Sequence, residues 1–156
     1  MKVLFLCTAN SCRSILSEAL FNHLAPAGAR AYSAGSEPKG FVHPLTLEAL
    51  QRAGVTCDGL CSKPIEAHAE LQPDVVITVC DKAAGEACPV FFGPALRAHW
   101  GLADPSEISG SDAEIAAAFD ATVARIRSRI QAFLVLPFDQ LDSAALRAEL
   151  ARIGSL

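Results

Sequence analysis

Two residues near the start of the chain have types and a spacing suited to nucleophilic chemistry. Cys7 ends the apolar run KVLFLC, and Arg13 follows after TANSC, where a helical pattern begins. Backbone N–H groups of such a strand-loop-helix turn point to one place, and the helix dipole adds positive potential there. The Arg13 guanidinium suits two oxygens of a tetrahedral oxyanion, and the same field predicts a lowered pKa for the Cys7 thiol. The spacing therefore predicts an oxyanion held against a nucleophile.

The loop between Cys7 and the helix supplies the rest of the predicted anion site. Asn10 is expected to brace this loop, and Ser14 to donate a hydrogen bond to the Cys7 thiolate. The alternative is a buried structural thiol at Cys7, because a cysteine and an arginine also reach this spacing by chance. The residues predicted to bind the oxyanion are Thr8, Ala9, Asn10, Ser11, Cys12, Arg13 and Ser14.

Composition indicates one globular domain. The chain has 156 residues, of which 51% are hydrophobic and 19% charged, and its net charge of -4 gives no sign of a nucleic-acid surface. No apolar run approaches the roughly 20 residues that a membrane span needs, and the apolar stretch at the N-terminus is too short for a signal peptide. A cytoplasmic location, with no nucleic-acid or membrane partner, is therefore expected.

Six cysteines narrow the chemistry further. In a reducing compartment such residues are catalytic, metal-bound or free rather than joined in structural disulfides. No C-x-x-C pair is present, which argues against a zinc site or a thioredoxin-type motif. Cys57 and Cys61 are interpreted as structural thiols, and Cys12 need not react. The six are Cys7, Cys12, Cys57, Cys61, Cys80 and Cys88.

Strands and helices alternate along the chain, which is typical of a parallel sheet covered on both faces. Ligands of such sheets bind at the carboxyl ends of strands, where Cys7, Cys80 and the loop after residue 100 all fall. A last helical pattern at 139–153 either packs back on the domain or serves a partner. The expected strands are 2–7, 29–34, 74–80 and 95–100, and the expected helices before that pattern are 14–25, 44–54 and 112–135.

The segment CTANSCRS resembles the C-x5-R-S/T loop of the low-molecular-weight protein tyrosine phosphatases and of the arsenate reductases that share their fold. The likeness continues through YSAG, VHPLTLEAL, DVVITVCDKAAGEACPV and AHWGLADPS. It implies a single three-layer α/β domain over 1–136, with a four-stranded parallel sheet flanked by helices. Residues 137–156 fall outside it and are predicted to form a C-terminal helical extension.

The resemblance assigns an acid to the site and bears on the choice between the two activities. Asp104, in LADPS, matches the family's aspartate-proline acid, although Asp-Pro read alone is also a turn signal. Related phosphotyrosine phosphatases usually have tyrosine after that proline, where this chain has Ser106. The one tyrosine, Tyr32, falls in an expected strand. These differences weaken the phosphotyrosine interpretation.

The resemblance also implies that Cys80 and Cys88 are the resolving cysteines of an arsenate reductase. In the implied relay, Cys7 attacks arsenate, Cys80 displaces arsenite from Cys7, and Cys88 moves the disulfide outward. Phosphate or sulfate would mimic arsenate, and the alternative function is a phosphatase acting through phosphocysteine. Two other readings are an idle Cys88 beside a buried Cys80, and a zinc site of both cysteines with His99. A non-catalytic anion-binding module is the third functional class.

The expected reductant is thioredoxin. The Cys80–Cys88 interval is one residue longer than in similar thioredoxin-coupled reductases, so glutaredoxin with a low-molecular-weight thiol is the alternative. Some relatives bind potassium through groups similar to Asn10, Glu18 and Ser33, but Lys63 stands where an acidic group is expected. The chain is therefore predicted to need no metal or cofactor and to show no potassium activation.

Overall fold

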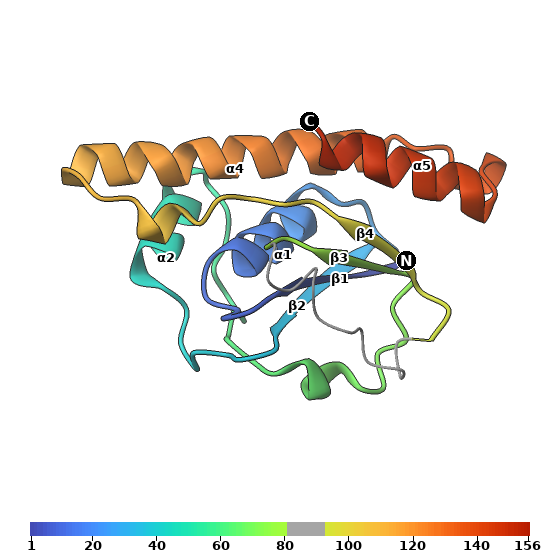
Figure 1. Cartoon of the computed structure of the whole chain (residues 1–156), viewed down its shortest axis with the longest axis horizontal. Helices are drawn as coiled ribbons and strands as arrows, with labels where there is room; N and C mark the ends of the chain where they lie inside the picture. Colours follow the sequence, from blue (N-terminus) through green and yellow to red (C-terminus); the bar gives the residue numbers. More distant parts are fainter. Residues whose placement is uncertain (81–92) are drawn as a thin grey trace.

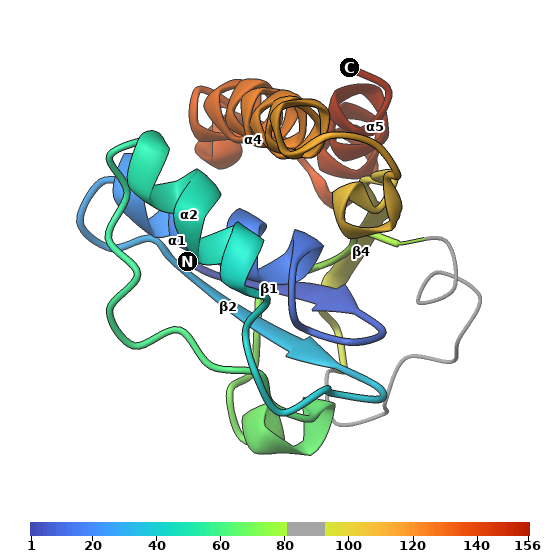
Figure 2. The ribbon, with the colours of Figure 1, turned by 90° about the vertical axis from the view of Figure 1, so that its left-hand side faces the viewer.

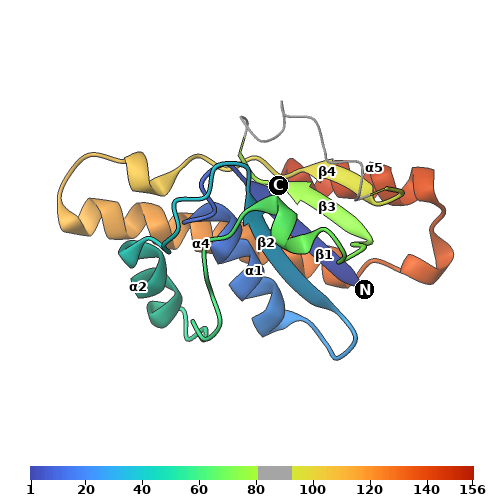
Figure 3. The same ribbon diagram turned by 90° about the horizontal axis from the view of Figure 1, so that it is seen from below.

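A four-stranded parallel sheet lies at the centre of the molecule (Figure 1). The computed structural model describes residues 1–80 and 93–156. Figure 3 shows the strands side by side in the order β2-β1-β3-β4. They are β1 (Lys2–Cys7), β2 (Arg30–Gly35), β3 (Val75–Thr78) and β4 (Leu96–His99). The predicted four-stranded parallel sheet is confirmed, and each strand lies within or one residue beyond its expected range.

Helices cover one face of the sheet, as Figure 2 shows for α1, α4 and α5. Side chains alternate along β1, so that Val3 and Phe5 pack on this helical side while Leu4 and Leu6 pack on the other. On that second face the described part of the chain contributes Ile65, from a single 3-10 turn at Ile65–His68. The helices are α1 (Arg13–Leu24), α2 (Pro44–Arg52), α4 (Asp112–Leu134) and α5 (Ser143–Gly154).

Local capping signals explain where the long helices begin. Ser111 and Glu114 form the capping box that their spacing predicts, so α4 begins at Asp112. At α5 the Asp142 side chain accepts a hydrogen bond from the N–H of Ala145 and sets the start of the helix at Ser143. The helix expected to begin at 139 therefore begins four residues later.

The C-terminal helix packs back on the domain. Leu150 and Ile153 are fully buried in the main core, and the indole N–H of Trp100 donates to the Leu150 carbonyl at 3.0 Å. Gly154 lies so close to β4 that an added Cβ would be 2.6 Å from the His99 carbonyl oxygen. Of the two roles considered for this segment, packing on the domain is the one observed. None of the helices described is long and apolar enough to cross a membrane.

Candidate active site

The carboxyl ends of β1 and β3 and the loop after β4 meet around one open pocket of about 740 Å³. Five of the residues predicted for the site line it. Cys7 lies just beneath, 3% exposed, whereas the loop residues from 10 to 12 are buried within the loop's own packing. Cys88 lies outside the described residues. The predicted residues that line the pocket are Thr8, Ala9, Arg13, Cys80 and Asp104.

Asn10 holds the loop in shape, as predicted. Its backbone has φ of 46°, a left-handed conformation that asparagine tolerates, and the residue is fully buried. Its amide nitrogen donates to Ser14 Oγ at 2.8 Å and Ser33 Oγ at 3.0 Å, and its amide oxygen accepts from the Lys63 N–H at 2.9 Å. The loop is thereby tied to α1, to β2 and to the segment before the 3-10 turn. A bond from Ser14 to the Cys7 thiolate stays a prediction.

Gly35 allows the end of β2 to pass directly under this loop. A Cβ at Gly35 would lie 2.5 Å from the Thr8 carbonyl oxygen and 2.9 Å from Asn10 Cβ. Both distances are far shorter than ordinary van der Waals contact, so the close approach requires glycine here. The YSAG segment therefore ends on a glycine for a steric reason.

The loop turns its carbonyl groups outward. The carbonyls of Thr8, Ala9 and Ser11 accept backbone hydrogen bonds from the N–H groups of Glu37, Lys39 and His43. Within residues 1–80 and 93–156, no backbone carbonyl accepts a bond from an N–H group of residues 9–13. The Ala9 N–H lowers the pKa of the nearby Cys7 thiol. The described backbone thus leaves these loop N–H groups without an acceptor, as in an anion-binding nest.

Arg13 is anchored at two points on the loop after β4. Its NH1 donates to the Leu102 carbonyl at 3.0 Å, and its NH2 lies 3.5 Å from Asp104 Oδ2. Its Nε is buried, and in the described structure neither it nor the buried hydroxyl of Ser11 has a hydrogen-bond partner. Buried donors without a partner are rare in folded proteins and point to a missing acceptor. An oxyanion at the loop would supply one.

Asp104 lies at the opposite side of the pocket, held by its own turn. Its Oδ1 accepts the Ser106 N–H at 2.9 Å and the Ser106 hydroxyl at 2.6 Å. Pro105 begins the 3-10 turn Pro105–Glu107. The Asp-Pro pair therefore starts a turn and also places Asp104 at the pocket. The carboxylate can therefore exchange a proton with a group bound at Arg13.

Cys80 brings a second thiol to Cys7. The Cys80 thiol lies near that of Cys7, and Thr8 Oγ1 lies 3.5 Å from the Cys80 sulfur. The neighbouring Cys80 thiol and burial raise the pKa of Cys7, and they outweigh Arg13 and the Ala9 N–H, which lower it. The prediction of a lowered Cys7 pKa is thus wrong, because Cys80 and burial favour the protonated thiol more than Arg13 and the loop N–H favour the thiolate. The proximity itself places two thiols where a disulfide can form.

A buried polar cluster beneath the loop contains the groups considered for potassium. Ser33 donates from its hydroxyl to Glu18 Oε1, and the Lys63 ammonium lies 3.8 Å from the same oxygen. Lys63 also donates to the Cys61 carbonyl at 2.8 Å. The ammonium thus places a fixed positive charge beside Glu18.

The histidines contact structural groups. His43 caps α2 by accepting the Leu45 N–H at Nδ1, and His68 bonds the Ser33 carbonyl. Burial lowers the pKa of His68. Among the described residues, no group of three or more His, Cys, Asp or Glu side chains could hold a metal. The zinc reading with Cys88 falls partly outside these residues.

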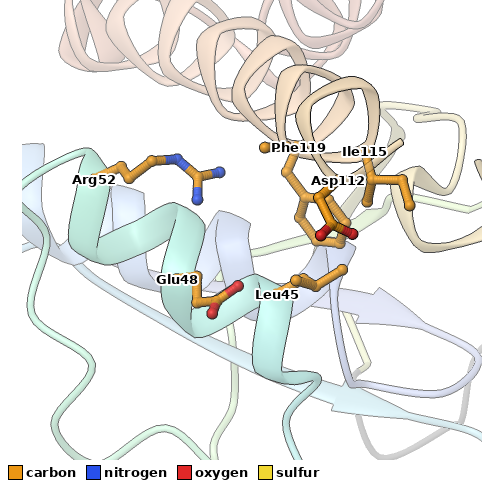
Figure 4. Close-up of a pocket in the computed structure, with 7 residues that line it drawn as sticks. Leu45, Glu48, Arg52, Asp112, Ile115 and Phe119 are labelled. Atoms are coloured by element: carbon orange, nitrogen blue, oxygen red, sulfur yellow. The ribbon is translucent and has the colours of Figure 1, made fainter. Parts of the chain in front are cut away.

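A second pocket of about 410 Å³ lies between α2 and α4 and contains none of the predicted site residues. Figure 4 shows Glu48 and Arg52 of α2 facing Asp112 and Phe119 of α4 across it. The described residues that line it include no thiol and no hydroxyl side chain. The chemistry therefore belongs to the pocket beside Cys7.

Several residues that line the first pocket were not predicted from the sequence. Lys39 and Glu107 line it, and the Lys39 N–H supports the loop through the Ala9 carbonyl at 3.0 Å. Neither residue belongs to a motif with a chemical meaning, so only the fold reveals them. Ile108, 45% exposed, forms an apolar part of the rim.

Known proteins resemble this chain in both sequence and fold. A family model for low molecular weight phosphotyrosine protein phosphatases matches residues 2–151. An arsenate reductase of Halalkalibacterium halodurans is 34% identical over 131 residues, which are 84% of this chain and 93% of the relative. A solved arsenate reductase in the phosphate binding state is 26% identical with a TM-score of 0.66, over 85% of this chain and 95% of that one.

A thioredoxin-dependent arsenate reductase of Corynebacterium glutamicum is 32% identical to this chain. The two structures superpose with a TM-score of 0.60, over 83% of this chain and 61% of the other. The chain therefore belongs to the low molecular weight phosphotyrosine protein phosphatase family, on the branch that contains the arsenate reductases.

Proposed function

We propose that this chain reduces arsenate to arsenite, with Cys7 as nucleophile and Cys80 as the first resolving thiol. The observation that carries the proposal is the position of Cys80, which lies in one buried cluster with Cys7 and lines the pocket together with Arg13. A hydrolytic phosphatase needs one thiol and a water, whereas a reductase needs two thiols that can pair. The arsenate reductases among its relatives support the same choice.

Arsenate is held by the loop N–H groups and the Arg13 guanidinium. Arsenate is tetrahedral and anionic like phosphate, and one related arsenate reductase is solved in a phosphate binding state. The buried Nε of Arg13 gains its acceptor, and its two terminal nitrogens keep the contacts to Leu102 and Asp104. A charge-assisted bond from Nε of a guanidinium held at both of its other nitrogens fixes the orientation of the anion.

The first chemical step joins sulfur to arsenic. Cys7 Sγ bonds to arsenic as one As–O bond breaks, and that oxygen leaves as water with the thiol proton, delivered through Asp104. Cys80 then attacks Cys7 Sγ, and the electron pair of the S–As bond passes to arsenic. Arsenic is reduced from the +5 to the +3 state, the Cys80 proton leaves with arsenite, and two thiols become the Cys7–Cys80 disulfide.

Regeneration needs a further thiol and an external reductant. We propose that Cys88 attacks Cys80, which frees Cys7 and leaves a Cys80–Cys88 disulfide. A dithiol protein such as thioredoxin then reduces this bond, as the name of the Corynebacterium glutamicum relative states for that protein. Glutaredoxin with a low-molecular-weight thiol is the other source of the two electrons.

The shape of the pocket favours a small inorganic anion over phosphotyrosine. Of the residues that the structure describes, those lining the pocket include no aromatic side chain to stack on a phenyl ring. Ser106 occupies the position after the Asp-Pro pair, and its hydroxyl donates a hydrogen bond to Asp104. Both observations support the reductase over the phosphatase.

A single-turnover reaction of fully reduced protein with arsenate, without added thiol, tests the proposal. We expect one arsenite per chain and the loss of two thiols, with Cys7→Ser inactive. Hydrolysis of an aryl phosphate is measured on the same sample. Unchanged thiols together with steady aryl phosphate turnover would identify a phosphatase instead.

A further inference from the structure

Arg129 is a buried cation that the proposed chemistry does not use. It belongs to α4, yet its side chain is only 3% exposed, although arginine is almost never fully buried without compensation. Its hydrogen bonds go to backbone oxygens: NH1 donates to Gly101 at 3.1 Å, and NH2 donates to Gly154 at 3.0 Å and Leu156 at 3.2 Å. Burial, with the nearby charge of Arg125, lowers the pKa of this guanidinium.

These bonds connect the end of the chain to the loop after β4, which lines the candidate active site. Gly101 precedes Leu102, whose carbonyl accepts from the Arg13 guanidinium, and Asp104 follows two residues later. The N–H of Leu102 is in turn held by the Val79 carbonyl at 3.0 Å. The segment from 101 to 104 is thus held by two contacts, one to Val79 directly after β3 and one to Arg129.

Figure 2 shows that α5 lies beside α4 and above β4, so one guanidinium can reach both segments. The planar fork of arginine holds two directions at once, with NH1 toward the loop and NH2 toward the end of α5. The half-buried Gly101 carbonyl, if it loses this donor, must find a new partner or move. The position of Leu102, and with it Arg13, therefore depends on this contact.

We propose that Arg129 is a positioning residue for the oxyanion site, and that it uses the docked C-terminal helix to hold the loop that anchors Arg13. The inference rests on the proposed function, in that the anion held by Arg13 is the substrate. It gives the segment 137–156, predicted as an extension, a role in the reaction. Its action is through the backbone of Gly101 and not through contact with arsenate.

The test compares phosphate affinity with thermal stability in the full chain. Isothermal titration measures the Kd of inorganic phosphate for the reduced wild type, Arg129→Met and Arg129→Lys, well below each Tm. We expect Arg129→Met to raise Kd about tenfold, the lower end of the loss seen when the partner that supports a metal ligand is removed. Arg129→Lys, which keeps the charge but not the fork, should raise it by less and carries the test if the methionine variant does not fold.

Leu150→Ala is the matched control, because it leaves a cavity beneath α5 but changes neither Arg129 nor the three carbonyls that it bonds, so the helix stays tied to the loop. It should lower Tm and leave the phosphate Kd within about twofold. A Kd unchanged in Arg129→Met, or raised equally in Leu150→Ala, would overturn the inference. Wild type that binds phosphate but does not reduce arsenate would overturn the proposed function alone, since phosphate binding is measured independently of reduction.

Discussion

Replacing Gly35 by alanine should disable the site while the sheet stays folded. The new Cβ would lie 2.5 Å from the Thr8 carbonyl oxygen, whereas ordinary contact begins at 3.4 Å. The loop and the end of β2 must therefore separate by about 0.9 Å. Gly35 is not among the residues with positive φ, so alanine meets a steric obstacle and no backbone strain.

The size of the effect follows from that displacement. A shift of about 1 Å in a group that positions substrate costs up to about 100-fold in rate, and we expect kcat/KM for arsenate to fall by about that factor. Overpacking should cost about 1–3 kcal/mol in the free energy of unfolding. Steady-state arsenite production and a denaturant titration measure the two quantities.

Gly28→Ala is the control for this experiment. Gly28 has φ of +94° and no atom within 4 Å of an added Cβ, so alanine there costs about 1 kcal/mol or more of backbone strain and touches nothing. It should lower stability and leave kcat/KM unchanged. A Gly35→Ala variant that keeps kcat/KM within threefold of the wild type would refute the argument that this close approach shapes the loop.

Three further outcomes are expected. Cys80→Ala removes the largest cause of the raised Cys7 pKa, so Cys7 should become thiolate at lower pH and alkylate faster at neutral pH. An unchanged pH profile of the Cys7 alkylation rate, followed by mass spectrometry, would contradict this. Burial raises the pKa of Cys12 to about 11, so about one in a thousand of these thiols is ionised at pH 8. Iodoacetamide should therefore label the exposed Cys61 far sooner than Cys12, and equal labelling rates would be inconsistent with the burial of Cys12. Because the Lys63 ammonium already lies in the cluster beneath the loop, exchanging sodium for potassium chloride should not change kcat, and a clear rise would disprove the assignment.

Local sequence patterns predicted the elements that have strong local signals. The apolar run of β1 and the capping box of α4 depend on neighbouring residues, and both lie where expected. At the C-terminus the helical pattern was visible from residue 139, but the Asp142 cap set a later start. Helix ends depend on such single hydrogen bonds, which periodicity does not reveal.

The features that the sequence could not predict depend on contacts between segments far apart in the chain. The direction of the Cys7 pKa depends on Cys80, which is brought to it by the pairing of β1 with β3. Arg129 falls among the buried Ile126 and Ile130 of α4, where a charged residue is ordinarily read as exposed. Its carbonyl partners come from two other segments, so no local pattern marks it as buried.

The Cys88→Ser variant gives the most direct test of the central claim, that arsenate is reduced by electrons from Cys7 and Cys80. Reduced variant is mixed with one equivalent of arsenate, quenched with an alkylating agent and mapped by mass spectrometry. We expect one arsenite per chain and a trapped Cys7–Cys80 disulfide. Arsenite formed without that disulfide, or no arsenite from a folded variant that binds phosphate, would contradict it.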